Sequence, residues 1–164
     1  MSMDNEKNEL IESFGAHFER IYNIPPLAGR ILSTLIIDGC KSGLTFEQLV
    51  EIMQASKSSV STNLNLLQKT NRVEYFTLVG DRKKYFKAAP LSQRLQNYLT
   101  LIDDEKTLVD KLKQFRKKNM SCEKEEINFH NMCAYKEHLI QVEQLLTTTI
   151  SKFKSIEIKN QSAK

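Results

Sequence analysis

Apolar residues recur at helical spacing through most of the chain, and the first stretch of this kind covers residues 4–22. Steps of four and three residues between apolar positions place them on one face of a helix. The apolar residues of this stretch are Leu10, Ile11, Phe14, Phe18, Ile21 and Tyr22. Pro25-Pro26 ends this helix and starts the next, because proline fits the first turn of a helix. A second helix is predicted from about Pro26 to Asp38, with Gly39 as its C-terminal cap.

A third helix is predicted over residues 43–53, and its start is well marked. Thr45 and Gln48 form the T-x-x-Q pattern of a capping box, in which each side chain accepts a hydrogen bond from a backbone N–H across the first turn. Leu44 and Leu49 stand at the positions of a hydrophobic staple.

A fourth helix is predicted from Lys57 to Lys69, with Ser56 as its N-cap. Its buried side is marked by Val60, Leu64 and Leu67. Two short helices joined by a turn of three or four residues are typical of a helix-turn-helix.

The spacing changes in "RVEYFTLVGDRKKYFKA", which begins at Arg72. Residues that favour strands flank Gly80-Asp81, so the pattern predicts a β-hairpin with Arg82, Lys83 and Lys84 at or just past its tip. A helix-turn-helix followed by a hairpin is a winged helix. The predicted fold class is therefore mainly α with a small β-hairpin wing.

Neither glycine nor proline occurs after Pro90, and two long helices with wide apolar faces are predicted there, separated by "RKKNMSCEKEE". These faces are wider than one small winged helix can cover, which favours a homodimer. The alternative is that the two helices pack only on each other. We expect residues 1–24 to contribute a dimerisation helix, residues 25–90 to form the winged helix-turn-helix domain, and residues 91–164 to form long dimerisation helices.

Composition narrows the setting of the protein. The 164 residues are enough for one domain, or one with an appendage. Three cysteines without a CxxC pattern favour a reducing cytoplasm. No apolar run approaches the ~18 residues of a membrane span, and the first residues do not resemble a signal peptide. We therefore expect a cytoplasmic protein with no membrane partner.

Positive charge is concentrated in residues 56–90, which carry seven basic and two acidic side chains. A basic patch is typical of proteins that bind polyanions, although a merely solvated face also produces one. The fourth helix adds an arc of short hydroxyl and amide side chains, where a solvated helix would favour Glu, Lys, Gln and Arg. Such side chains suit a helix that lies in the major groove of DNA.

The cations have complementary places in this hypothesis. Lys57 lies in the first turn of the fourth helix, where a cation interacts unfavourably with the helix dipole, and a phosphate bound at this end would make its position favourable. The wing cations suit phosphate and minor-groove contact. Arg30, Arg72 and Lys87 are weaker candidates for phosphate contact. The predicted DNA-binding residues are Ser56, Lys57, Ser58, Ser59, Ser61, Thr62, Asn65, Lys69, Arg82, Lys83 and Lys84.

Other constellations carry little chemistry. The residues His130, Cys133, His138 and Cys122 match no standard zinc spacing, so no metal and no cofactor are expected. A redox role for Cys40, Cys122 or Cys133 is left open. The sequence has no Gly-rich phosphate loop, nucleophile elbow or paired catalytic carboxylates, so an enzyme is not expected.

The stretches "LTFEQLVEIMQASKSSVSTNLNLLQKTNRVEYF" and "GDRKKYFKA", with the order of the elements, resemble the MarR superfamily of bacterial transcription regulators, and its GbsR-like branch in particular. The resemblance implies a homodimer that binds palindromic operators, mostly as a repressor. The sequence departs from the family pattern at two places: Ser58 lies at or next to a usual glycine, and Asn71 occupies the turn before the wing, where glycine is common. Asp81 and Arg82 are adjacent, which leaves open whether Arg82 or Lys83 enters the minor groove.

Many members of this superfamily respond to a small molecule held between their DNA-binding and dimerisation parts. The aromatic residues Phe14, Phe18, Tyr22 and Tyr98 are candidates for lining such a pocket, although aromatics at helical spacing more often belong to a core. The effector-binding residues are therefore unknown. The expected function is a sequence-specific regulator that binds double-stranded DNA. The alternative is a protein-interaction module, or a non-repressing activator, whose basic segment binds an acidic partner.

Overall fold

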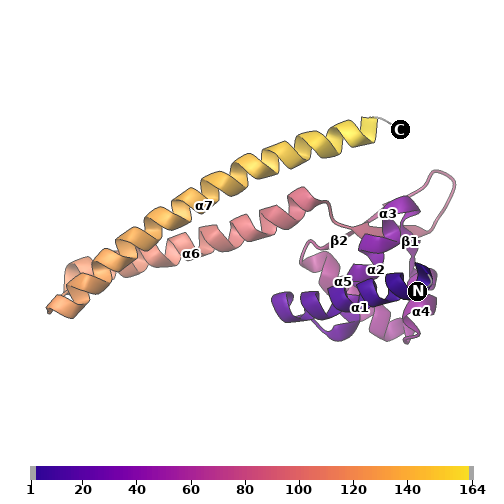
Figure 1. Ribbon diagram of the computed structural model, residues 1–164, viewed down its shortest axis with the longest axis horizontal. Coiled ribbons are helices and arrows are strands. Elements are labelled where there is room, and N and C mark those ends of the chain that lie inside the picture. The colour runs from indigo at the N-terminus through magenta and orange to yellow at the C-terminus, as the bar shows by residue number, and fades with distance from the viewer. Residues whose placement is uncertain (1–2, 163–164) are drawn as a thin grey trace. The chain divides into compact units, whose positions relative to one another are not determined.

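The computed structural model describes residues 3–162 and contains two compact units, one ending at Ala89 and the other beginning at Pro90 (Figure 1). Its elements in chain order are α1 Met3–Tyr22, α2 Pro26–Ile37, α3 Gly39–Ser42, β1 Leu44–Thr45, α4 Phe46–Met53, α5 Lys57–Lys69, β2 Val73–Thr77, β3 Lys84–Ala88, α6 Leu91–Asn119 and α7 Glu123–Ser162. The strands form one antiparallel sheet in the order β1-β3-β2. The predicted fold class, mainly α with a β-hairpin wing, is confirmed.

The first unit has a single core in which α2 is the central helix. Ala28, Ile31 and Leu35 of α2 are almost entirely buried, and they belong to one cluster with side chains from α1, α4, α5 and the sheet. Because α2 is surrounded by these elements, apolar residues are needed on most of its surface. The core fixes the positions of α4, α5 and the wing.

The contact between α1 and α2 depends on a close approach of their backbones at Gly15 and Gly29. A Cβ atom at Gly29 would lie 2.6 Å from the carbonyl oxygen of Gly15, whereas a Cβ atom at Gly15 would make ordinary contacts of 3.4 Å or more. Phe18 packs one turn further along α1 and is 1% exposed. Only glycine fits at position 29 at this separation of the helices.

Two predictions around residues 38–46 are wrong. Gly39 does not cap α2, because Asp38 at the cap keeps a right-handed conformation and Gly39 opens the short helix α3. The next helix begins at Phe46, not at residue 43, because Gly43 has a φ of +71° and β1 pairs with β3. The capping box itself is confirmed: the backbone N–H of Thr45 donates to Gln48 Oε1, and that of Gln48 donates to Thr45 Oγ1.

The second unit consists of α6 and α7, which lie side by side as a long helical hairpin (Figure 1). Its few well-buried side chains include Val109 and Leu139. Ion pairs such as Lys106–Glu143 and Lys136–Asp110 also join the two helices. None of the helices within residues 3–162 is long and apolar enough to cross a membrane.

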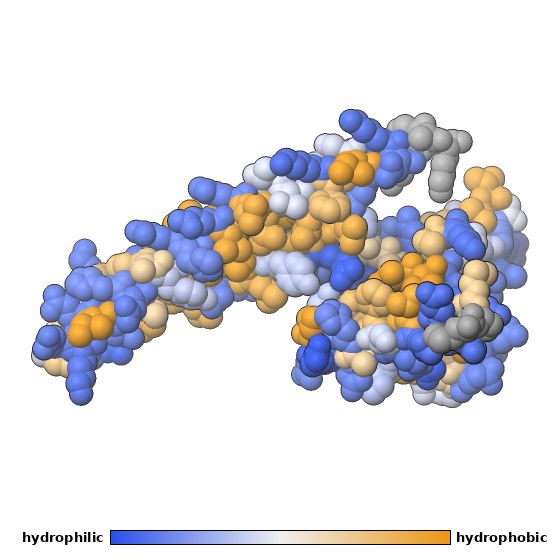
Figure 2. Space-filling model, in the orientation of Figure 1, coloured by the Kyte–Doolittle hydropathy of each residue, from blue (hydrophilic) through white to orange (hydrophobic). Residues whose placement is uncertain are grey.

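Much of the apolar surface of this hairpin is uncovered, and Figure 2 shows apolar side chains gathered along it. Leu101, Leu108 and Phe115 stand seven residues apart on α6 and are 64%, 64% and 57% exposed. If the two helices pack only on each other, which is the alternative prediction, these residues stay exposed. The exposed apolar residues of α7 include Ile127, Ile140, Leu145 and Ile156.

The close contact of α1 with α2 can be tested with a matched pair of glycine variants. Gly29→Ala is expected to lower the free energy of unfolding by about 1–3 kcal/mol, because the new methyl group must push α1 away from α2. Gly15→Ala is expected to be neutral or stabilising by up to about 1 kcal/mol, because alanine is the better helix former and the site has room. Urea unfolding followed by circular dichroism measures both. Equal effects of the two variants would contradict the close crossing.

Candidate nucleic-acid interface

The predicted recognition helix is α5, and its sequence explains how it is held. Val60, Leu64 and Leu67 are at most 3% exposed and pack into the core. Ser56 caps the helix by accepting a hydrogen bond from the backbone N–H of Ser59 at 3.2 Å. One apolar face and a capped N-terminus therefore fix the orientation of the opposite face.

All the candidate DNA-binding residues on and next to α5 lie on the exposed side of the unit. The structure divides them by what their side chains do. Ser56 and Ser59 hydrogen-bond to each other through their hydroxyls, at 2.8 Å, and so serve the cap. The exposed candidates are Ser56, Lys57, Ser58, Ser59, Ser61, Thr62, Asn65 and Lys69.

Ser61, Thr62 and Asn65 differ from the capping serines because their polar atoms form no side-chain hydrogen bond with any other residue in the range 3–162. Asn63, by contrast, donates its amide to the carbonyl oxygen of Ser59 at 2.8 Å. Free hydroxyl and amide groups on an exposed helix face are able to bond base edges and phosphates. These three residues are the best placed to read sequence.

The wing consists of β2, β3 and the tip between them, residues 78–83. Arg82, Lys83 and Lys84 are exposed. No ion pair forms at these three cations within the described part of the chain, and Lys84 Nζ lies 4.2 Å from the centre of the Tyr75 ring. The wing therefore presents its positive charge to solvent.

Asp81 organises the tip that carries these cations. Its Oδ1 accepts the backbone N–H of Lys83 at 2.9 Å, and its Oδ2 accepts the phenol of Tyr85 at 2.7 Å. The hydrogen bond from Lys83, followed by that from Tyr85, holds the pKa of Asp81 below its usual value. The bond to Asp81 also raises the pKa of Tyr85. Asp81 is thus committed to backbone and phenol and forms no ion pair with Arg82.

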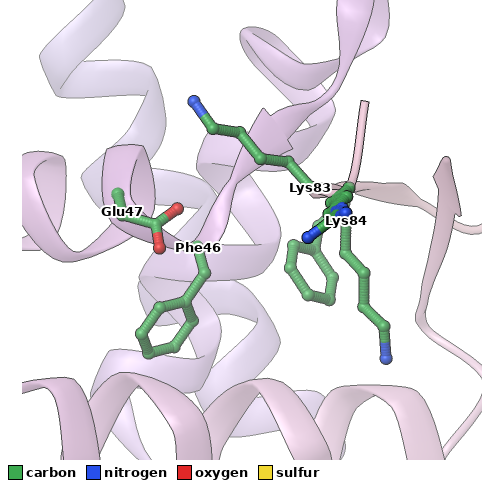
Figure 3. A pocket seen from close by; sticks show the side chains of 6 residues that line it. Phe46, Glu47, Lys83 and Lys84 are labelled. Atoms are coloured by element: carbon green, nitrogen blue, oxygen red, sulfur yellow. The ribbon is translucent and has the colours of Figure 1, made fainter. Parts of the chain in front are cut away.

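A groove of about 400 Å³ runs between the wing and the first turn of α4 (Figure 3). Phe46 and Glu47 lie on the α4 side, and Lys83 and Lys84 lie on the wing side. Sequence reasoning did not find this groove, because it depends on the two-residue strand β1. Pairing of Thr45 with Tyr85 places the start of α4 beside the wing, and two residues are too few to show a strand period.

The weaker candidate cations have other partners. Arg30 pairs with Glu12 at 2.8 Å, and Lys87 pairs with Glu74 at 3.0 Å. The guanidinium of Arg72 lies 3.5 Å from the centre of the Tyr22 ring. These contacts engage three side chains that the sequence offered only as weaker candidates for phosphate contact.

The aromatic residues of α1 are largely structural. The Phe18 ring stacks on the Tyr22 ring at a centroid distance of 5.5 Å, and Tyr22 also meets Arg72. Phe14 is 40% exposed. Phe18 is therefore a core residue of the first unit, which is the usual place of an aromatic residue at helical spacing.

The cysteine and acidic residues are the remaining candidates for metal or thiol chemistry. Within residues 3–162 no group of three or more His, Cys, Asp or Glu side chains is placed to hold a metal ion. Cys40 and Cys122 are exposed and Cys133 is half-buried, and none of the three is in a disulfide.

Comparison with known proteins supports the fold. No family model matches the chain. It is 30% identical over 90 residues to the HTH-type transcriptional regulator MmpR5 of Mycobacterium tuberculosis, and the match covers 55% of this chain and 53% of that protein. The chain thus spans about half the length of this curated relative.

Among solved structures, the chain resembles the crystal structure of a transcriptional regulator with a TM-score of 0.70 and 20% identity, over 92% of this chain and 99% of the other. A second solved structure is MepR, a transcription regulator of the Staphylococcus aureus multidrug efflux pump MepA, with a TM-score of 0.42 and 18% identity, over 83% and 94% of the two chains. The first of these shows that the chain has the fold of a solved transcriptional regulator over nearly its whole length.

The Asp81 contacts give a pH prediction. Because the pKa of Asp81 is lowered, the ordered wing tip is expected to be complete above the usual aspartate pKa of 3.8 and lost only as the pH falls through the lowered value. A carboxyl titration of Asp81 by NMR measures this midpoint. In Tyr85→Phe the midpoint should move toward 3.8, since one of the two hydrogen bonds is gone. A wild-type midpoint at or above 3.8 would rule out the contact in solution.

Proposed function

We propose that this protein is a transcription regulator that binds double-stranded DNA through α5 and the wing. The observation that carries this proposal is the exposed face of α5, on which Ser61, Thr62 and Asn65 have unbonded polar groups, beside a wing with exposed cations. Because the opposite, apolar face of α5 is buried in the core, only the polar face is available to DNA. The fold shared with a solved transcriptional regulator supports the same function.

In this proposal α5 lies in the major groove, where Ser61, Thr62 and Asn65 contact base edges. Amide and hydroxyl groups distinguish base pairs there because each pair presents its own pattern of donors and acceptors. Lys57 and the capped N-terminus of α5 meet a phosphate, and Lys69 meets another. Arg82, Lys83 and Lys84 follow the flanking backbone and minor groove.

We further propose that the protein acts as a homodimer on a palindromic operator, with half-sites about 34 Å apart. The exposed heptad-spaced residues of α6 support this, because apolar residues at that spacing form helix–helix seams. The exposed Leu10 and Ile21 of α1 suit a contribution from the N-terminal helix. Membership of the MarR superfamily, and of its GbsR-like branch, rests on the sequence motifs quoted above.

Repression is the mode that this family resemblance favours, with relief by a small-molecule effector as a further implication. No enzymatic activity is proposed, and a cytoplasmic location follows from the same assignment. A basic module that binds an acidic protein is the competing function. Salt dependence alone does not separate the two, so the test needs preference for one DNA sequence.

DNA binding is tested with duplexes from the region upstream of the protein's own gene, using fluorescence anisotropy at several salt concentrations. Arg82→Ala combined with Lys83→Ala is expected to weaken binding to all sequences. It should also reduce the slope of log K against log salt by about 4, since each of the two copies in the proposed dimer loses two phosphate contacts. The control is Lys117→Ala with Lys118→Ala, which removes the same charge from the end of α6. If the control variant weakens binding equally, the wing has no special role.

Sequence reading is tested separately by Asn65→Ala. This variant is expected to lose about 1–3 kcal/mol of discrimination between the preferred site and a base-substituted site, while binding to unrelated DNA is unchanged. Asn63→Ala is the matched control, because its amide is already bonded to α5. Retained discrimination in Asn65→Ala would contradict base contact by this residue.

Dimer formation is tested by Leu108→Glu, which places a charge in the exposed seam of α6. We expect this variant to be monomeric in sedimentation equilibrium, because an unpaired charge opposes burial of the seam. Lys111→Glu, on the same helix at an exposed position, should remain dimeric. A monomeric wild-type chain would remove the dimer from the proposal without touching DNA binding.

A further inference from the structure

The tip of the wing carries two exposed apolar side chains that have no role in the proposed function. Val79 is 109% exposed and its neighbour Leu78 is 49% exposed. Single exposed apolar residues are ordinary on protein surfaces. Here two adjacent ones stand at the outermost turn of a hairpin, beside the exposed cations Arg82 and Lys83.

The tip is built to hold Val79 outward. The backbone N–H of Asp81 donates to the carbonyl oxygen of Leu78 at 3.0 Å, which closes a β-turn with Val79 and Gly80 as its central residues. Gly80 has a φ of +83°, as the third residue of a type II turn requires. The side-chain contacts of Asp81 to Lys83 and Tyr85 close the next part of the tip.

The β-turn and the side-chain hydrogen bonds of Asp81 give the tip a fixed conformation, and Val79 is not buried in that conformation. No heavy atom lies within 4 Å of a Cβ built at Gly80, so the tip projects into open space. Folding of the wing therefore gives no reason for a valine at the most exposed position. A contact made only in a complex does give one.

We propose that Val79, backed by Leu78, is an apolar wedge that the wing presses into the minor groove of bound DNA. This inference rests on the proposed DNA-binding function. The cations Arg82 and Lys83 suit the phosphates on either side of the groove, so the charge of the tip matches this occupant. Apolar side chains in the minor groove partly unstack a base step and bend the duplex away from them.

A wedge of this kind makes Val79 a specificity-determining residue that forms no hydrogen bond to a base. Pyrimidine–purine steps such as TA and CA unstack most easily, so a site with such a step under the wing costs less to deform. The expected consequence is a preference for these steps at the outer edges of the site, beyond the bases that α5 contacts.

The experiment compares three full-length chains: wild type, Val79→Ile and Val79→Thr. Threonine keeps the branched shape of valine but replaces one methyl group by a hydroxyl, and isoleucine keeps the apolar character. Each chain selects duplexes from a random-sequence DNA library. 2-Aminopurine is then placed at the outer steps of the duplex selected by the wild type.

Wild type and Val79→Ile are expected to enrich TA or CA steps at the outer positions and to raise 2-aminopurine fluorescence on binding. Val79→Thr should lose both effects, with about a tenfold smaller preference for those steps, while its thermal unfolding is unchanged because residue 79 is fully exposed. Equal selection and equal fluorescence for all three chains would overturn the wedge and leave DNA binding intact. A wild-type chain that selects no sequence would overturn the proposed function itself.

Discussion

Burial of three aliphatic side chains on one face of α5 is the interaction on which the candidate interface depends. Val60, Leu64 and Leu67 pack against the core built on α2, and this contact decides which face of α5 is buried. The opposite, polar face then points to solvent by the geometry of the helix. Loss of that packing would release the helix that carries most of the proposed base contacts.

The wing depends on a different kind of constraint, made from hydrogen bonds on an exposed hairpin. Asp81 accepts from the backbone of Lys83 and from the phenol of Tyr85, so its carboxylate orders the tip without neutralising a cation. This arrangement leaves the charges of Arg82 and Lys83 available, while the backbone N–H of Asp81, bonded to the carbonyl oxygen of Leu78, closes the turn that carries Val79. Rigid presentation matters because a flexible tip would lose conformational entropy on binding.

The two units of the chain use their apolar residues differently. In the first unit Ala28, Ile31 and Leu35 of α2 are buried, as is the apolar face of α5. In the second unit α6 keeps a row of leucine and phenylalanine side chains in solvent, and α7 has exposed isoleucine and leucine side chains. Two helices can bury only the faces that point at each other, so a wider apolar face needs further partners. This surplus is the physical basis of the proposed dimer.

Helix spacing, capping residues and the change to strand residues determined α1, α2, α5, both strands of the wing and the long terminal helices, because these signals are local. The N-cap at Ser56 and the capping box at Thr45 were readable for the same reason. Only the tertiary structure decided the pairing of β1 with β3, the role of Gly39, and which cations were already paired. The pairings of the strands and of the cations depend on residues far apart in the chain, as when Glu74 pairs with Lys87 or Tyr22 stacks on Arg72. Charge counted along the sequence does not contain that information, since it is set by which side chains the fold brings within contact distance.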